Sequence, residues 1–217
     1  MVKSRGPYQV GRERRERVIA AASARFAADG YDRTVLDQVA QDAEISLGAL
    51  QHYFPSRRHL LAAVAENRLD VATADWESRG PTADVHEIFE RMQAATVAFL
   101  RQPGMIELAV RVSADAIDPA SPAHDVITAR YRRISSRIED DFTRSRDAGQ
   151  LRADMEPAFV ARLCLAVGDG LQLQWALSAQ SIDLATLSGK GLAAVARAVI
   201  PSSTIDEARL AALGGEA

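Results

Sequence analysis

The residues best placed to do chemistry lie close together between positions 46 and 57, and their types suit contacts with DNA. Ser46 can cap a short helix, whose first turn then presents free N–H groups and a positive dipole end to a phosphate. Gly48 lets a helix backbone approach a groove closely, and Gln51 can pair bidentately with adenine. Neighbouring apolar groups can touch a thymine methyl, and polar groups can donate to phosphates. The candidate DNA-contacting residues here are Ser46, Leu47, Gly48, Ala49, Gln51, His52, Tyr53 and Arg57.

A helix-turn-helix is the element that would position these side chains. Apolar spacing predicts three short helices in this part of the chain, over about residues 12–28, 35–42 and 47–53. Gly30 ends the first of them, and residues 42–45 form a tight turn between the second and third. Thr34 and Asp37 have the spacing of a capping box for the second helix. Such an arrangement predicts a DNA-binding domain over residues 1–56.

Two segments of this region carry a specific pattern: R-R-E-R-V-I-A-A-A-S-A-R-F-A-A-D-G-Y-D-R-T-V-L-D-Q-V-A and I-S-L-G-A-L-Q-H-Y-F-P-S-R-R-H-L-L-A-A-V. Over more than fifty residues this pattern resembles the TetR family of one-component transcriptional regulators. The resemblance implies a DNA-binding head, a variable helical body that binds a small ligand, and a homodimer. It also implies individual roles: Thr34 contacts a phosphate, Leu47, Gly48, Ala49 and Gln51 face the major groove, and His52, Tyr53 and Arg57 hold the DNA backbone.

Four positions depart from the usual family pattern. Glu44 stands where glycine is common, and Leu47, Ala49 and Gln51 stand where Lys, Thr and Tyr are frequent. If position 44 requires a positive φ, its glutamate costs on the order of 1 kcal/mol there. Its charge would also lie near a DNA-facing edge. These changes leave the motif intact and predict fewer phosphate contacts.

Charge is distributed unevenly along the 217 residues. The whole chain has a formal net charge of −3, from 26 basic and 29 acidic residues, which on average argues against a nucleic-acid binder. Residues 1–60 hold ten basic and seven acidic residues, a net of +3, whereas the remainder holds 16 and 22, a net of −6. A basic first quarter on an acidic body indicates a small anion-binding module followed by a separate domain.

The expected location is the cytoplasm. The chain has one cysteine, so no intrachain disulfide can form. The longest uncharged runs have twelve residues, too few for the roughly 18 that a bilayer requires, and no signal peptide is expected.

After residue 56 the periodicity predicts further helices, at about 56–78, 84–102, 105–116, 122–148, 155–178 and 184–199. Ser121 and Pro122 should be the N-cap and first residue of the fourth of these, and Gly149 its C-cap. The tail after Pro201 is either frayed or a short extra helix. The predicted fold is therefore all-α, with residues 57–217 as a helical domain for effector binding and dimerisation.

The body offers two candidate sets of apolar residues. Residues suited to a ligand pocket are Phe89, Met92, Thr96, Phe99, Met105, Leu108, Val112, Tyr131, Ile134, Gln172 and Trp175, and plain core is the alternative role for each. Residues suited to a dimer interface are Leu163, Val167, Leu171, Leu187, Leu192 and Val195, and a monomer core is the alternative. The lack of Lys or His clusters favours an uncharged, largely apolar effector.

No catalytic motif is present, and no cofactor or metal is expected. His86 and His124 are expected at the surface, and Cys164 in packing. Lys3 and Arg5 form either a minor-groove arm or a disordered terminus, and the arginines of the first helix either contact phosphates or are solvated. The predicted function is a ligand-responsive regulator, more readily a repressor, which binds a pseudo-palindromic operator as a dimer without a membrane partner. The alternatives are a DNA-binding regulator without an effector, or an all-α enzyme or carrier.

Overall fold

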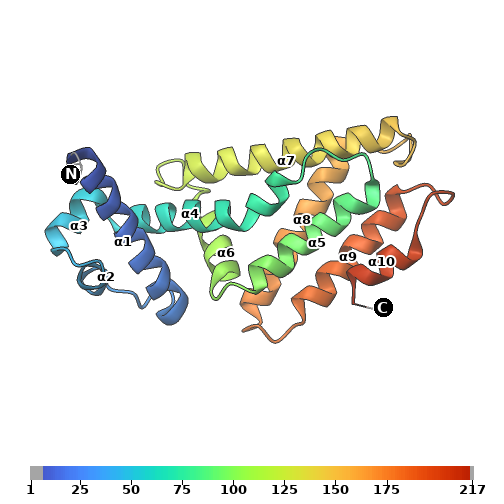
Figure 1. Cartoon of the computed structure of the whole chain (residues 1–217). Helices are drawn as coiled ribbons and strands as arrows, with labels where there is room; N and C mark the ends of the chain where they lie inside the picture. The colour runs from blue at the N-terminus through green and yellow to red at the C-terminus, as the bar shows by residue number, and fades with distance from the viewer. Residues whose placement is uncertain (1–6, 216–217) are drawn as a thin grey trace, which may run out of the picture. The chain divides into compact units, whose positions relative to one another are not determined.

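The computed structural model describes residues 7–215, and the side chains of these residues except at 7, 8, 71–75 and 77. This part of the chain forms helices and no strand, which confirms the all-α prediction (Figure 1). The helices are α1 (Pro7–Asp29), α2 (Leu36–Asp42), α3 (Leu47–Tyr53), α4 (Arg57–Ser78), α5 (Val85–Leu100), α6 (Met105–Asp115), α7 (His124–Asp147), α8 (Pro157–Leu177), α9 (Leu184–Val199) and α10 (Glu207–Leu213). Within the described residues, no helix is both long and apolar enough to cross a membrane.

The predicted glycine stops after α1 and α7 and the predicted start of α5 are confirmed. Gly30 and Gly149 follow α1 and α7 with φ values of 83° and 73°, the left-handed conformation that glycine adopts without steric cost. Asp84 caps α5, since its carboxylate accepts the backbone N–H groups of His86 and Glu87.

The predicted N-caps of two helices are wrong, and α1 begins at Pro7, five residues before its predicted start. Thr34 does not cap α2, because its hydroxyl donates instead to the carbonyl oxygen of Gly30 at 2.9 Å. The extended residue before α2 is Val35, which makes no side-chain cap. Ser121 lies outside α7, where its hydroxyl accepts the N–H of Ala123 and donates to Asp115, so that α7 begins only at His124.

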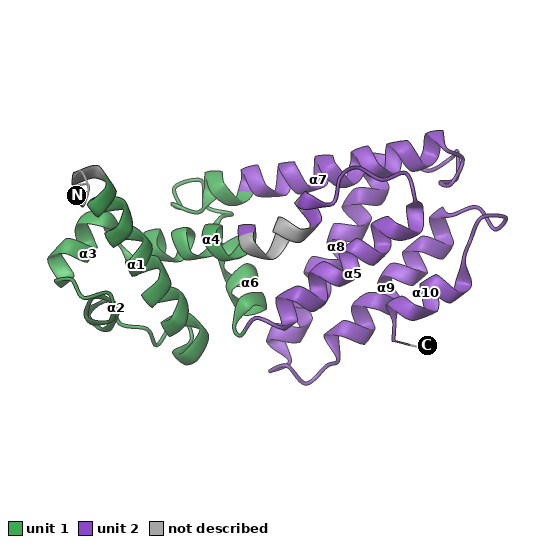
Figure 2. Cartoon of the chain, viewed as in Figure 1, with its two compact units in different colours: residues 1–69, 103–127 green, residues 70–102, 128–217 purple. Residues whose placement is uncertain are grey.

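The chain divides into two compact units (Figure 2). Unit 1 comprises residues 1–69 and 103–127, and unit 2 comprises residues 70–102 and 128–217. The first part of α4 and the whole of α6 therefore belong with the helix-turn-helix. The boundary at residue 56 marks the end of the motif and stays a prediction.

Each unit has its own core. In unit 1 the predicted apolar stripe of α1 is buried together with residues from α2, α3 and α4, namely Val18, Ile19, Ala22, Phe26, Val39, Leu50, Leu60 and Leu61. In unit 2 the core joins α5, α7, α8, α9 and α10 around an edge-to-face pair of rings, Phe89 and Phe142, whose centroids are 5.6 Å apart.

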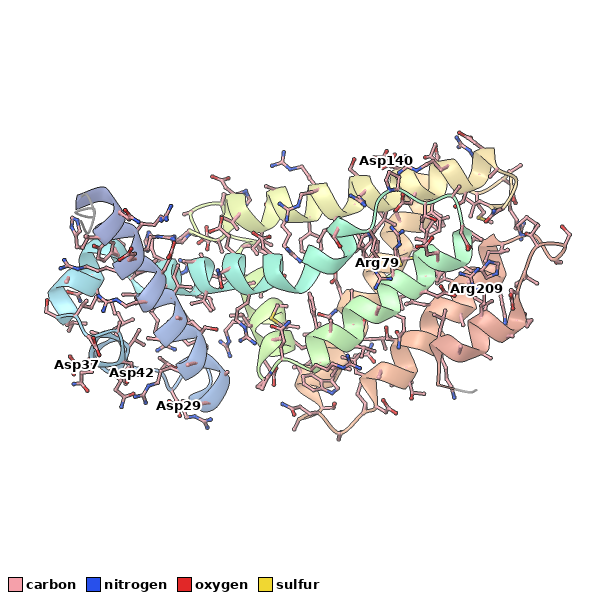
Figure 3. The ribbon with its side chains drawn as sticks, in the orientation of Figure 1. Asp29, Asp37, Asp42, Arg79, Asp140 and Arg209 are labelled. Carbon is pink, nitrogen blue, oxygen red and sulfur yellow. The ribbon has the colours of Figure 1, made fainter. Side chains whose placement is uncertain are left out.

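The tail after Pro201 forms a helix that packs on the body. A Cβ at Gly189 of α9 would collide with the carbonyl of Leu213, so glycine permits the close approach of α10. Arg209 of α10 donates to Glu90 and Asp84, and Figure 3 shows its side chain among the elements of unit 2. Burial raises the pKa of Asp84, but the hydrogen bond from Arg209 and those from the backbone N–H groups of Glu87 and His86 outweigh it and hold this pKa below its usual range.

Candidate nucleic-acid interface

The turn between α2 and α3 is built on a left-handed residue. Glu44 has φ 56°, so the condition stated for this position, a positive φ where glycine is common, is met. Its N–H donates to the carbonyl of Gln41, and the N–H of Ile45 donates to the carbonyl of Ala40. This pair of bonds is the Schellman arrangement, which satisfies the last carbonyls of α2 and sets the direction of α3.

The third helix presents a narrow outer face. Leu50 is fully buried and Phe54 is nearly so, which anchors the inner side of α3. On the other side Leu47, Gly48, Gln51 and His52 are exposed, with the spacing that places side chains on one helical face. We define these four residues as the outer face of α3.

The ends of α3 are held by polar and aromatic contacts. The Ser46 hydroxyl accepts the N–H of Ala49 at 3.2 Å, which confirms the predicted cap. Ala49 itself is half-buried. Tyr53 is half-buried too, with its hydroxyl beside Gly11 of α1 and its ring edge-on to His52 at 5.8 Å. Ser46 and His52 are thus exposed, whereas Ala49 and Tyr53 offer only part of their surface.

The structure does not present Thr34 to a phosphate. Its side chain is 1% exposed, and its hydroxyl is used within the chain by the bond to Gly30. The phosphate contact of Thr34 stays a prediction, and it would require the hydroxyl to leave the Gly30 carbonyl.

Arg57 makes contacts inside unit 1 that the sequence did not suggest. Its guanidinium donates to the carbonyl oxygen of Tyr31 at 2.6 Å and stacks on the Tyr31 ring, 4.2 Å from the centroid. Arg111 of α6 lies over the same ring at 5.3 Å and pairs with Asp32 at 2.7 Å. We call Tyr31, Asp32, Arg57 and Arg111 the tyrosine cluster. The cluster joins the α1–α2 loop to α4 and α6. Asp32 and Arg111 are 79 residues apart, so no local sequence pattern predicts their pairing.

Neighbouring charges also pair within the unit. Arg58, at the start of α4, donates to Asp115 at 2.8 Å and to Asp118 at 3.3 Å. Arg25 of α1 donates to Asp42 of α2 at 2.6 Å, and this hydrogen bond lowers the pKa of Asp42 (Figure 3). These pairs position helices, since each links two elements.

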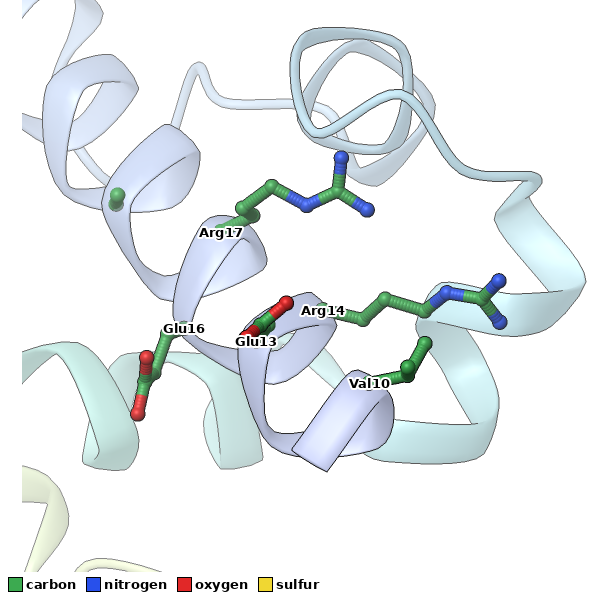
Figure 4. A pocket seen from close by; sticks show the side chains of 6 residues that line it. Val10, Glu13, Arg14, Glu16 and Arg17 are labelled. Atoms are coloured by element: carbon green, nitrogen blue, oxygen red, sulfur yellow. The ribbon is translucent and has the colours of Figure 1, made fainter. Parts of the chain in front are cut away.

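Further arginines of unit 1 lie on α1. An open hollow of about 640 Å³ runs along this helix and is lined by Val10, Glu13, Arg14, Glu16, Arg17 and Ala20. Figure 4 shows Arg14 and Arg17 extending to the same side of α1. Arg17 lies 3.6 Å from the carboxylate of Glu44, in an exposed pair. Lys3 and Arg5, the proposed arm, lie outside the described residues.

The predicted pocket residues divide between the units. Met105, Leu108 and Val112 of α6 are buried in unit 1. In unit 2, Phe89 and Met92 belong to the core, and Thr96 is buried with its hydroxyl bonded to the Met92 carbonyl. The remaining residues of that set are partly or largely exposed, namely Phe99, Tyr131, Ile134, Gln172 and Trp175. Their role in a pocket stays a prediction.

The predicted interface residues on α8 and α9 differ in exposure. Leu192 and Val195 are 3% and 8% exposed and lie in the core of unit 2, so packing within the chain accounts for them. Val167 and Leu171 are half-buried against α9, where a Cβ at Gly191 would crowd them. Among the predicted residues, Leu187 is exposed, and Leu163 is half-buried against the core.

Groups that could act as catalysts are used in packing. Burial raises the pKa of the Cys164 thiol to about 12, so it stays protonated. His86 is 6% exposed, not at the surface as predicted, and its Nε2 accepts the backbone N–H of Asp206 at 2.9 Å. Nδ1 of His124 lies 2.8 Å from the Ala116 carbonyl. Within the described residues, no group of three or more acidic, His or Cys side chains could hold a metal.

Comparisons with known proteins agree with this geometry. Residues 18–64 match the model of bacterial regulatory proteins of the tetR family. The repressor KstR of Rhodococcus jostii is 29% identical over 134 residues, 60% of this chain and 61% of its own length. KstR of Mycobacterium tuberculosis is 30% identical over 145 residues, 60% of this chain and 64% of its own length. The matches thus span less than two thirds of these relatives.

A solved structure extends the likeness to the body. SmeT, the repressor of the SmeDEF multidrug efflux pump of Stenotrophomonas maltophilia, superposes with a TM-score of 0.70 at 23% identity. The superposition covers 88% of this chain and 93% of SmeT, which shows that the fold is shared. Residues 18–64, which contain the helix-turn-helix with its Ser46 cap, match the tetR family of bacterial regulatory proteins, and the chain shares its overall fold with SmeT.

Proposed function

We propose that this chain is a transcriptional repressor that binds operator DNA through the outer face of α3 and leaves it when a small ligand binds the helical body. The observation that carries this proposal is the outer face itself, whose four exposed residues lie on a helix held by the Schellman turn and the Ser46 cap. A rigid helix with a free outer face is what insertion into a major groove requires. The KstR and SmeT relatives, named as repressors, favour the same assignment.

In this proposal Gln51 and Leu47 read bases, and Ser46, His52 and Tyr53 contact the DNA backbone. Gly48 lets the backbone of α3 approach the major groove closely. Packing within the described protein does not require glycine there, because a built Cβ would meet nothing within 4 Å. Arg57 supports the motif through the tyrosine cluster and has less capacity to hold a phosphate than the sequence suggested.

A second copy of the chain would cover an exposed apolar stripe on α8. Phe159, Leu173 and Leu177 are 58%, 45% and 78% exposed, at helical spacing, and Leu187 of α9 is exposed as well. Gly168 and Gly170 have no neighbour within 4 Å of a built Cβ, so nothing in the chain accounts for their small size. A homodimer explains both features and would set two α3 helices about 34–36 Å apart on a pseudo-palindromic operator.

Selection of bound sequences from a random DNA library tests the proposal, followed by anisotropy titration of the selected duplex. Gln51→Ala should change the preferred bases and cost about 1–3 kcal/mol on the original site. Gln174→Ala, an exposed glutamine of α8, is the matched control and should leave the preference unchanged. Absence of any enriched sequence, or an identical preference in both variants, would contradict the assignment of α3.

The dimer has a separate test by sedimentation velocity. Leu177→Glu introduces a charge into the stripe and should shift the chain toward monomer, with loss of operator affinity. Ile117→Glu, at an exposed apolar residue of unit 1, controls for the added charge. Equal sedimentation of both variants would contradict the α8 interface. We place the protein in the cytoplasm with its DNA, and assign it no catalytic role.

A further inference from the structure

The last part of α4 and the first half of α7 run side by side in unit 2 and in the same direction (Figure 1). Their register is fixed at two levels. Asp70 accepts hydrogen bonds from Arg130 and Arg133, and further along, the N–H of Thr82 donates to Asp141. Thr82 lies beyond the end of α4, so these bonds bracket the chain from residue 70 to 82 against α7 from residue 130 to 141. Trp76 and Arg137 both lie within these bracketed segments.

In these segments three buried N–H donors have no acceptor. The indole Nε1 of Trp76 and the Nε and Nη2 atoms of Arg137 are inaccessible to solvent, and no hydrogen-bond partner exists for them in the described part of the chain. Buried donors in folded proteins are nearly always paired, because each one left unpaired loses its bonds to water. Three such donors on α4 and α7 suit an acceptor from outside the described residues, such as a bound ligand.

Arg137 lacks the ion pair that other arginines of α7 form with described residues. Arg130, two helical turns earlier and therefore on the same face, is 8% exposed and pairs with Asp70. Arg144, two helical turns later, pairs with Asp141. Arg137 forms no ion pair with any described residue. Asp169, the described acid of α8, is bonded to the hydroxyl of Tyr131. A ligand that pairs with Arg137 would therefore bring its own negative charge.

The surroundings of these donors are apolar. Trp76 packs against the core of unit 2, and so do Ile134, one turn before Arg137, and Leu163 of α8. A guanidinium matches a carboxylate or a phosphate with two parallel hydrogen bonds, and an indole N–H adds a third donor. We propose that Arg137 and Trp76 bind the anionic head group of a small amphipathic ligand whose apolar part lies against Trp76, Ile134 and Leu163.

This inference rests on the proposed function, because it names the chemical class of the effector. It revises the uncharged effector that composition favoured: Arg137 supplies a positive charge inside the body that no cluster of lysines or histidines signalled. The rival explanation lies within the chain. Asp141, one turn after Arg137, has a buried Oδ2 without a partner, and a changed rotamer of Arg137 could pair the two.

Calorimetric titration of the full chain without DNA tests the site. The probes are straight-chain carboxylates from hexanoate to dodecanoate, each compared with the primary alcohol of the same length. The wild type should bind a carboxylate roughly ten- to hundredfold more tightly than the matched alcohol, the range for hydrogen bonds to a charged group. Arg137→Gln should remove this preference and leave binding of the alcohols unchanged, and Trp76→Phe should reduce it. Dodecyl phosphate distinguishes a phosphate head from a carboxylate.

Two controls separate the site from a structural role. Arg132→Gln removes an exposed charge from the same helix and should keep the full preference. Arg137→Met should leave the Tm of the ligand-free chain unchanged or raised, because it removes a buried charge without a partner. A lowered Tm would instead support pairing with Asp141 and overturn the proposal. Equal affinity for acids and alcohols, no binding of any probe, or an unchanged preference in Arg137→Gln would also overturn it.

A DNA readout distinguishes failure of this inference from failure of the proposed function. Anisotropy of the selected duplex is measured with and without the acid that binds. If the acid binds at Arg137 and DNA stays bound, the anion site stands and the effector part of the proposed function falls. If DNA binds specifically and no acid binds, the anion site falls and the DNA-binding function stands.

Discussion

Replacing Glu44 with glycine should stabilise unit 1 and strengthen DNA binding at the same time. A non-glycine residue in the left-handed conformation costs about 1–2 kcal/mol, and the greater freedom of glycine in the unfolded chain takes back part of this gain. The net gain for Glu44→Gly is then about 0.5–1 kcal/mol, or a rise in Tm of roughly 1–4 °C for a chain of this size. The two hydrogen bonds of the turn use backbone atoms only, so they survive the change.

The same substitution removes a carboxylate 3.6 Å from Arg17. A freed Arg17 can pair with a phosphate, which would steepen the slope of log affinity against log salt by about 0.9. Glu44→Ala separates the two effects, because alanine removes the charge but keeps the left-handed cost. It should show the gain in affinity without the gain in Tm. Equal Tm values for the glycine and alanine variants would refute the strain argument, and an unchanged salt slope in both would refute the role of Arg17.

Three further outcomes are expected. Arg57→Gln should lower the stability of unit 1 and weaken binding to all DNA sequences. The slope of log affinity against log salt should stay unchanged, because the guanidinium is bonded to Tyr31. A slope reduced by about one would show instead that Arg57 contacts a phosphate. Cys164, whose pKa burial raises to about 12, should react with a disulfide reagent at neutral pH only after unfolding, and rapid labelling of the folded chain would contradict its burial. Asp84 has a lowered pKa in the fold, so its contribution is present above the ordinary carboxyl range and is lost as pH falls through the lowered value. Urea unfolding between about pH 6 and pH 3 should show this loss, and Arg209→Gln should diminish it; identical pH profiles for the two proteins would count against the pair.

Features that depend on neighbours within a few residues were predictable from the sequence. The Ser46 cap and the glycine stops at 30 and 149 each involve one turn of helix, so residue type alone decides them. The left-handed backbone at Glu44 followed from its place in the motif. Thr34 shows the limit of such local prediction. Its hydroxyl can either cap α2 or donate to the carbonyl of Gly30, and the sequence does not decide between these two bonds.

Pairings between distant segments were not predictable. The Tyr31 ring meets Arg111 from α6, and His86 accepts an N–H from a residue 120 positions later. Only the packed helices bring these groups together. The apolar residues of α9 present the same difficulty, since Leu187 is exposed and Leu192 is buried although both suit either environment. Which face of an apolar helix is covered by its own chain depends on the neighbouring helices, which a single helix does not encode.

The open space around Gly48 bears on how such a regulator can diverge. A Cβ built there would meet no described atom within 4 Å, and Gln51 and His52 beside it are exposed, so folding places almost no constraint on the outer face of α3. After a gene duplication, one copy could exchange these residues singly, without a compensating mutation elsewhere and without loss of the folded state. New DNA targets would then be reached by steps that selection on stability does not oppose, while the buried side of the same helix stays unchanged.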